Sequence, residues 1–236
     1  MSLDQRSIIV TGAAGNLGAA TARVLARAGA LLTLADTNPE HLDALAKSLE
    51  VKHPPLLIRG ADVRTHDGCA RIADETLQHF GRIDGLANTV GTFQMAPVAE
   101  GAADQWQLLM ELNALSALRL SAAVAPAMKA QKYGRIVHVA AGAGLKAFAG
   151  ASVYSASKAA LIRITEAVSE EHKNDGICAN CIMPSTIDTP QNRAAMPKAD
   201  TSKWVQPDAI AKVIAFLLSP DAGPITGAAI PVFGRA

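Results

Sequence analysis

The sequence predicts an α/β fold, a doubly wound parallel sheet of seven strands with helices on both faces, and three observations support this. The chain has 236 residues, a size that suits one large α/β domain better than two. Half of its residues are hydrophobic, which is enough for a large buried core. Short apolar runs alternate with amphipathic stretches along the whole chain, as expected for strands joined by helices. We therefore expect a single domain over 1–236.

The strands and helices can be placed in order along the chain. Seven apolar runs are the expected strands: Ser7–Thr11, Leu31–Ala35, Pro55–Arg59, Ile83–Asn88, Arg135–Ala140, Ile177–Met183 and Ala228–Val232. The helical patterns lie near 17–29, 39–50, 67–80, 104–130, 152–174 and 207–218. Asn38-Pro39 opens one of these helices, because Asn is a good N-cap and Pro suits the first helical position. The longest irregular segment is 184–206, and a long loop inside a compact domain is usually functional.

Composition and charge exclude several classes of function. A net charge of +1 gives no reason to expect nucleic acid or an anionic membrane as a partner. No apolar run is long enough to predict a membrane span, and the polar start does not resemble a signal peptide, so we expect a cytoplasmic protein. Of the three cysteines, Cys178 and Cys181 form a C-x-x-C, but on a strand they point to opposite faces. We expect neither a disulfide framework nor a metal site.

A glycine-rich segment between the first strand and the first helix indicates a dinucleotide site. Gly12, Gly15 and Gly18 lie within Thr11–Gly18. Glycines there permit a tight turn and a close approach of the backbone to a pyrophosphate, which the N-terminus of the helix attracts. This is the arrangement of a Rossmann-type fold, although an ordinary glycine-rich turn is an alternative.

Asp36, at the end of the second strand, bears on the choice of cofactor. A carboxylate there can accept both ribose hydroxyls of an adenosine and would repel a 2′-phosphate. No Arg or Lys lies in 12–18 or next to Asp36, so we expect NAD(H) as the cofactor. Asp36 could also cap the turn before Pro39, and both interpretations can hold at once.

Tyr154 and Lys158 are the candidate catalytic pair. Their spacing of four places both side chains on one face of a helix. A cation near a phenol lowers the pKa of the phenol, which would make Tyr154 a proton donor near neutral pH. A surface pair on a helix is the alternative, since Y-x-x-x-K alone is common.

Taken together, these residues resemble the short-chain dehydrogenase/reductase family over nearly the whole chain. Thr11–Gly18 resembles its T-G-x-x-x-G-x-G turn, Asp62-Val63 its adenine contact, Asn88–Gly91 its N-N-A-G, and Pro184–Thr189 its P-G-x-I-x-T. The resemblance implies Tyr154, Lys158 and Asn113 as catalytic residues, with Asn113 anchoring a water that relays protons. It implies a cofactor site made of Gly12, Gly15, Asn16, Leu17, Gly18, Asp36, Asp62, Val63, Asn88, Tyr154, Lys158, Pro184, Ile187 and Thr189. It also implies a homodimer or homotetramer formed through helices 104–130 and 152–174.

Ala141 departs from this pattern, because the family has a catalytic Ser at that position. In one interpretation the substrate needs no Ser. Residues of 184–206, from Pro184 to Trp204, resemble dihydropteridine reductase, which lacks the Ser, prefers NADH and reduces a quinonoid pterin. The function is then hydride transfer between NAD(H) and a small carbonyl or quinonoid substrate. In the other interpretation the chain is a catalytically weakened sensor or scaffold that binds NAD(H).

Overall fold

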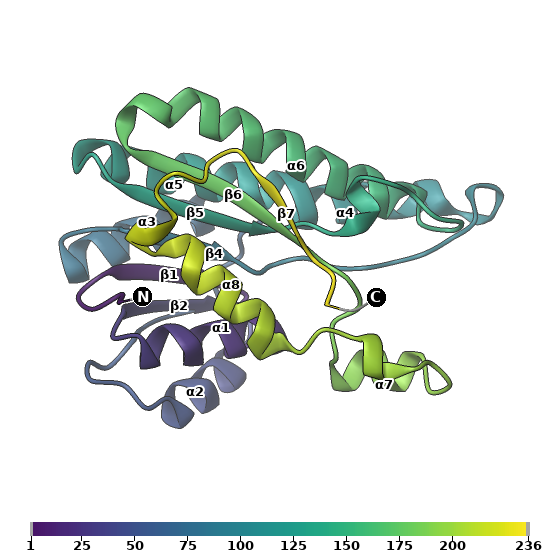
Figure 1. Ribbon diagram of the computed structural model, residues 1–236, viewed down its shortest axis with the longest axis horizontal. Helices are drawn as coiled ribbons and strands as arrows, with labels where there is room; N and C mark the ends of the chain where they lie inside the picture. Colours follow the sequence, from purple (N-terminus) through teal and green to yellow (C-terminus); the bar gives the residue numbers. More distant parts are fainter. Residues whose placement is uncertain (1, 235–236) are drawn as a thin grey trace.

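The computed structural model describes residues 2–234 and contains one sheet of seven parallel strands (Figure 1). The strand order is β3-β2-β1-β4-β5-β6-β7. The strands are β1 (Ser7–Thr11), β2 (Leu31–Asp36), β3 (Leu56–Arg59), β4 (Gly85–Asn88), β5 (Gly134–Val139), β6 (Ile177–Pro184) and β7 (Ala229–Val232). Every neighbouring pair is parallel, so the predicted fold class is confirmed.

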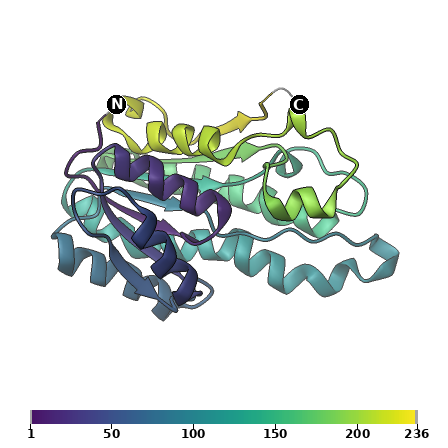
Figure 2. The same cartoon turned by 90° about the horizontal axis from the view of Figure 1, so that it is seen from below.

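Helices cover both faces of the sheet. One face carries α1 (Asn16–Arg27), α2 (Pro39–Ser48) and α8 (Pro207–Leu218), whose apolar residues share one buried cluster. The other carries α3 (His66–Phe80), α4 (Trp106–Met110), α5 (Ser116–Ala130) and α6 (Ser152–His172); α3, α5 and α6 contribute to a second cluster. Figure 2 shows α1 in purple lying beside the yellow-green α8, and these two helices are in contact.

The strand order reverses next to β1, and this creates the place where such sheets bind ligands. β1 lies between β2 and β4, so the chain leaves the sheet in opposite directions on its two sides. Thr11 is paired with Ala35 on β2 and with Asn88 on β4, and Asn88 is paired with His138 on β5. The carboxyl ends of these strands therefore meet at one edge, where the predicted site residues follow.

Two predicted elements differ from the structure. The helix expected over 104–130 is interrupted by a π-helical turn, Glu111–Leu115. The segment 184–206, expected to be irregular, contains α7 (Pro190–Ala195). Thr189 caps α7 by accepting a hydrogen bond from the Asn192 N–H, and Pro190 takes the first helical position. The Thr-Pro signal was therefore present in the sequence, in the same form as Asn38-Pro39 before α2.

Contrary to the expectation from the sequence, one stretch of the described residues, Ala102–Ala130, which contains α4 and α5, is long and apolar enough to cross a membrane by length and composition. Half of its most apolar window is buried, and α5 packs against α3, α6 and β5. These are the properties of a core helix in a domain of this kind.

Candidate active site

The glycine-rich turn is shaped by close contacts between backbone atoms. A Cβ at Gly18 would lie 2.0 Å from the carbonyl oxygen of Gly12, so no side chain fits there. Gly12 has a φ of +66°, a conformation that favours glycine. Gly15 is the N-cap of α1 and makes no side-chain capping bond, which leaves the first N–H groups of the helix for an anion.

The match to the family's turn is shifted by one residue. The middle glycine of T-G-x-x-x-G-x-G falls on Asn16, and Gly15 precedes it. Asn16 is the first residue of α1, and its side-chain amide donates to Gln191 Oε1 on α7 at 2.8 Å. Leu17, next in the helix, is buried in the core beneath the turn.

Two departures from the family's N-N-A-G are explained by contacts with the same turn. The Thr89 hydroxyl donates to the Thr11 carbonyl oxygen at 2.8 Å and lies 3.3 Å from the Gly12 carbonyl oxygen. The side chain of Val90 lies within 3.1 Å of where a Gly12 Cβ would be. Thr89 and Val90 therefore brace the glycine-rich turn from the end of β4.

Asp36 is held between the glycine-rich turn and α2. Its carboxylate accepts the Ala14 N–H at 2.9 Å and the Asn38 N–H at 2.9 Å, one on each oxygen. The expected capping contact is therefore present. Each oxygen keeps further acceptor capacity, so ribose binding remains compatible with it.

The expected adenine contact lies after β3. Val63 is buried, whereas Asp62 forms an ion pair with Arg64 at 2.7 Å. Hydrogen bonds from Arg64 hold the pKa of Asp62 below its usual range. Asp62 is thus an ionised acceptor that is already engaged with its neighbour.

A buried chain of hydrogen bonds runs beneath the site from β1 to α5. The Thr11 hydroxyl donates to Asn88 Oδ1 at 2.9 Å, and Asn88 Nδ2 lies 3.4 Å from His138 Nδ1. His138 Nε2 lies 3.1 Å from the Ser121 hydroxyl. Burial, with the nearby Lys158 charge, lowers the pKa of His138 to about 4. The imidazole is therefore neutral, and it helps to fix the Asn88 carboxamide.

Tyr154 and Lys158 lie together on α6, but not in the relation expected from the sequence. Lys158 Nζ donates to the Val139 carbonyl oxygen at 2.7 Å and lies 6.0 Å from the centre of the Tyr154 ring. Burial raises the pKa of Tyr154 to about 12 and lowers that of Lys158 to about 8. The expected lowering of the Tyr154 pKa by Lys158 is not found in this geometry, because burial of the phenol raises the pKa instead.

Asn113 lies in the π-helical turn, and hydrogen bonds hold its carboxamide between the segment after β4 and α6. Its carboxamide accepts the Thr92 N–H at 2.8 Å, donates to the Thr92 carbonyl at 2.9 Å and donates to Ser157 Oγ at 3.0 Å. The Ser157 hydroxyl donates in turn to the Tyr154 carbonyl at 2.7 Å. Ser157 was not among the site residues predicted from the sequence, although it stands three residues after Tyr154 on α6.

Gly91 lies against two of the three catalytic candidates, Asn113 and Lys158. A Cβ at Gly91 would lie 3.0 Å from Asn113 Oδ1 and 3.2 Å from Lys158 Nζ. A side chain at this last glycine of the N-N-A-G pattern would therefore crowd both Asn113 and Lys158.

Ala141 lies at the start of the segment after β5, and its side chain is nearly buried. Apolar groups surround this part of the site. Phe233 lies 3.3 Å from where a Gly142 Cβ would be, and Phe93 packs edge-on against the Tyr154 ring with centroids 4.8 Å apart. No pattern in the sequence singled out these two phenylalanines.

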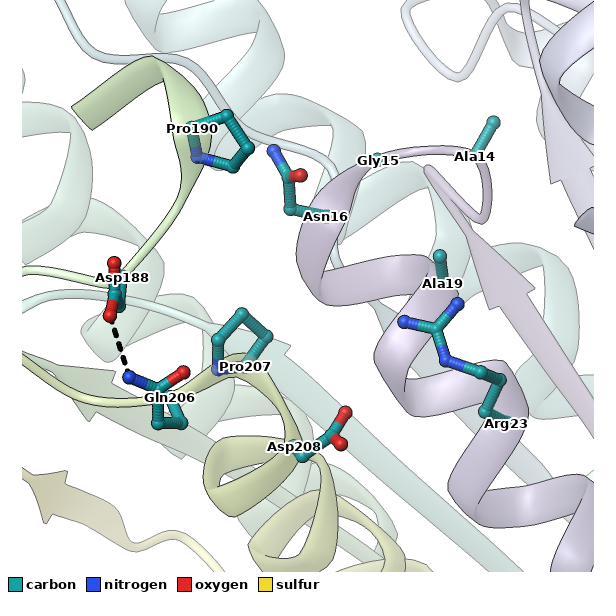
Figure 3. A pocket seen from close by; sticks show the side chains of 10 residues that line it. All are labelled: Ala14, Gly15, Asn16, Ala19, Arg23, Asp188, Pro190, Gln206, Pro207 and Asp208. Carbon is teal, nitrogen blue, oxygen red and sulfur yellow. Dashed lines mark hydrogen bonds between the residues drawn. The ribbon is translucent and has the colours of Figure 1, made fainter. Parts of the chain in front are cut away.

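The segment after β6 brings the last predicted residues to the glycine-rich turn. Pro184 ends β6, Ile187 accepts a bond from Asn192 Nδ2 at 2.8 Å, and Thr189 caps α7. A cleft of about 600 Å³ separates this segment from α1 (Figure 3). Asn16 and Pro190 face each other at one end of the cleft, and Arg23 lies along α1.

The residues present fit a dinucleotide. The uncapped N-terminus of α1 offers N–H donors to a pyrophosphate, and the glycine contacts keep the turn free of side chains. Asp36 lies on one side of the turn and Asn88 and Thr89 on the other, as a ligand spanning β2 to β5 requires.

Comparisons with known proteins agree with this geometry. The family described as short chain dehydrogenase matches residues 6–200. The meso-2,3-butanediol dehydrogenase of Serratia marcescens is 32% identical over 100% of this chain and 96% of its own length. The 3-oxoacyl-acyl-carrier-protein reductase FabG of Thermotoga maritima is 29% identical over 99% and 98%.

Two solved structures share the fold. A levodione reductase superposes with a TM-score of 0.90 at 27% identity, covering 98% of this chain and 97% of that one. An NAD⁺-bound xylitol dehydrogenase superposes with a TM-score of 0.91 at 27% identity, covering 99% and 100%.

Proposed function

The chain belongs to the short-chain dehydrogenase family of oxidoreductases, and from this premise we propose an NAD(H)-dependent enzyme that transfers hydride between nicotinamide and a small carbonyl or quinonoid, pterin-like substrate. The observation that carries the proposal is that Asn113 and Lys158 both lie against Gly91, at the carboxyl ends of β4 and β5, with the Tyr154 ring centre 6.0 Å from Lys158 Nζ. A cluster of titratable groups in this place has a catalytic use that a purely structural domain does not need.

In this proposal about 1–130 binds most of the cofactor and about 131–236 carries the catalytic helix and the substrate loop. Gly12, Gly15, Asn16, Leu17 and Gly18 hold the pyrophosphate, and Asp36 accepts the adenosine ribose hydroxyls. Asp62 and Val63 border the adenine. Asn88, Lys158, Pro184, Ile187 and Thr189 hold the nicotinamide half. The acidic Asp36 supports NAD(H) rather than NADP(H), and the NAD⁺-bound relative in the same fold is consistent with that choice.

The proton chemistry follows from the state of Tyr154. With a pKa of about 12 its phenol is protonated at neutral pH, so it can donate a proton to a substrate oxygen. Nicotinamide, when bound, supplies or accepts the hydride. Lys158, held on the Val139 carbonyl, and Asn113, held on Thr92 and Ser157, fix the surroundings of Tyr154. We assign to Asn113 the anchoring of a water that relays protons.

The sensor alternative finds no specific support, since Tyr154, Lys158 and Asn113 are all in place. We also propose a cytoplasmic homodimer or homotetramer. Trp106 on α4 and Leu118 on α5 are large exposed apolar side chains, and a second copy packed on this helical face would cover them.

The test combines cofactor binding with turnover. Purified protein is titrated with NADH by fluorescence, and NADH oxidation is followed with carbonyl and quinone acceptors. We expect Tyr154→Phe to lower turnover at least about 100-fold while NADH affinity stays within about twofold, because the phenol acts on the substrate. Turnover that survives Tyr154→Phe would refute the assigned proton donor, and failure to bind NADH would refute the cofactor.

A further inference from the structure

The substrate end of the site has an apolar character that the proposed function leaves unused. In segments 89–97 and 140–151, which follow β4 and β5, and directly after β7, five large apolar side chains are at least one third exposed. We call them the apolar rim: Phe93, Met95, Leu145, Phe148 and Phe233. Because the carboxyl ends of parallel strands share one edge of the sheet, these segments converge around the same place.

Contacts tie the rim to the catalytic tyrosine. Phe93 packs edge-on against the Tyr154 ring, with an interplanar angle of 89°. Met95 lies 3.1 Å from where a Gly150 Cβ would be, and the next residue, Ala96, donates its N–H to the Gly150 carbonyl at 2.9 Å. The segments after β4 and β5 are thereby joined beside Tyr154.

Phe233, after β7, packs against Gly142, the residue that follows Ala141. Its ring lies 3.3 Å from where a Gly142 Cβ would be, and the Ser185 hydroxyl donates to its carbonyl oxygen at 3.0 Å. The end of β7 is therefore anchored to the segment after β6 and places an aromatic ring next to Ala141.

The charge of these walls is as informative as their shape. Segments 89–97 and 140–151 contain a single charged residue, the exposed Lys146. A charged substrate group held against the rim would lose hydration without gaining a buried partner. An apolar ring would gain about 25 cal/mol for each Å² it buries and could pair with the aromatic side chains.

Ala141 adds an independent constraint on reactivity. Ala141 presents a methyl group where the family has a Ser hydroxyl, so Tyr154 is the donor that we assign to the substrate oxygen. Losing one such donor commonly costs about 3 kcal/mol in the transition state. A carbonyl conjugated with a second carbonyl compensates for this loss, because the added group makes its carbon more electrophilic.

We propose that the substrate is an uncharged ring dione or quinone, with its ring on the apolar rim and its reacting oxygen on Tyr154. This inference rests on the proposed function. In the reduction the conjugated carbonyl system gains the hydride that NADH supplies, which leaves NAD⁺. The substrate oxygen gains the Tyr154 proton, and the tyrosine is reprotonated from solvent. The products are a hydroxyketone from a dione and a hydroquinone from a quinone.

The experiment compares three acceptors with NADH: phenanthrenequinone as an uncharged ring dione, diacetyl as an acyclic dione, and acetoacetate as a charged ketone. We expect kcat/KM for phenanthrenequinone to exceed that for diacetyl by at least about tenfold, from the additional buried area. Acetoacetate should be poorer still.

Variants then test the rim itself. Phe93→Ala and Phe233→Ala should each raise KM for phenanthrenequinone at least about fivefold, since each removes a large apolar contact surface. The NADH affinity and the circular-dichroism spectrum of both variants should match those of the unmodified protein, which shows that the fold and the cofactor end are intact. The matched control is Phe216→Ala, because Phe216 is an exposed aromatic residue on α8 outside the rim. This variant should leave KM unchanged for both phenanthrenequinone and diacetyl.

The outcomes separate the inference from the proposed function. A preference for acetoacetate that Lys146→Ala abolishes would overturn the inference and leave a reductase for anionic substrates. Equal use of the ring and acyclic diones would overturn it as well. If Phe93→Ala or Phe233→Ala changes the oligomeric state seen by light scattering and leaves KM unchanged, the rim is covered by a second copy of the chain and the inference fails. No Tyr154-dependent turnover of any acceptor would overturn both.

Discussion

The glycine-rich turn and the apolar rim lie at the two ends of one candidate site. Backbone contacts shape the turn, whereas side chains form the rim. In the turn, backbone atoms touch, as where Gly18 lies against the Gly12 carbonyl. In the rim, exposed side chains project, as with Phe93, which is 53% exposed. The turn therefore tolerates almost no added atom, whereas rim side chains can change without disturbing the core. The backbone of the fold therefore determines the shape of the cofactor end, whereas the identity of the exposed side chains determines the shape of the substrate end.

The largest effect should come from breaking the turn. Gly18→Ala places a Cβ 2.0 Å from the Gly12 carbonyl oxygen, so the turn must open. We expect a loss of at least about 3 kcal/mol in the free energy of unfolding and no measurable NADH binding. Denaturant unfolding and NADH titration measure the two effects.

Gly15→Ala is the matched control, because its Cβ would lie 3.3 Å from the same oxygen. It should cost no more than about 1 kcal/mol. A Gly18→Ala protein as stable as Gly15→Ala would show that the turn is not held by this contact.

The buried chain beneath the cofactor end should respond to pH. The pKa of His138 is about 4 in the folded protein against 6.5 ordinarily, so the unfolded chain binds more protons between these values. Stability therefore falls as the pH drops through this window, by roughly 2 kcal/mol between about pH 7 and 5 from this one group.

His138→Asn keeps a polar side chain between Asn88 and Ser121 but removes the titrating group. Urea unfolding of both proteins across the window should give a shallower pH dependence for the variant. Identical slopes would mean that His138 is not buried and neutral in the folded protein.

The preference for NADH over NADPH tests the role of Asp36, which lies beside the glycine-rich turn. We expect NADH to bind at least about tenfold more tightly than NADPH, which is about 1.4 kcal/mol, because Asp36 repels a 2′-phosphate. Asp36→Asn keeps an acceptor for the Ala14 N–H and removes the charge. It should therefore reduce the ratio of NADH affinity to NADPH affinity. Equal affinities of the unmodified protein for the two cofactors would remove Asp36 from the ribose.

The smallest effect should come from the substrate end. Ala141→Ser adds a hydroxyl donor to a site not shaped to orient it, so it should restore only part of the about 3 kcal/mol of a fully oriented donor. We expect about 1 kcal/mol, or roughly fivefold, for substrates that lack their own activation. We expect the rate with a simple ketone to rise relative to that with phenanthrenequinone, measured as a ratio of kcat/KM values. Ala143→Ser is the control. Good ketone reduction before any substitution would show that another group replaces the Ser.

Much of the fold and of the cofactor end could be predicted from the sequence. Apolar runs placed all seven strands within about two residues, because burial on both faces of a parallel sheet leaves a local signature in each strand. Gly12 and Gly18 were recognisable because the turn needs their missing side chains. Tyr154 and Lys158 were recognisable because a helix fixes the relation between residues four apart.

Other features were decided only by the tertiary structure. Nothing local predicts that Lys158 binds the Val139 carbonyl, that Asn113 is held by Thr92, or that Phe93 lies on Tyr154. Desolvation, which decides the pKa of Tyr154, likewise depends on everything packed around it. The physical reason is the same in each case: these contacts join residues from separate elements, and their energies exist only once the sheet has brought its loops to one edge. Sequence patterns therefore predict the conformation of each segment, whereas the contacts between segments, and the pKa values that depend on them, are determined by tertiary packing.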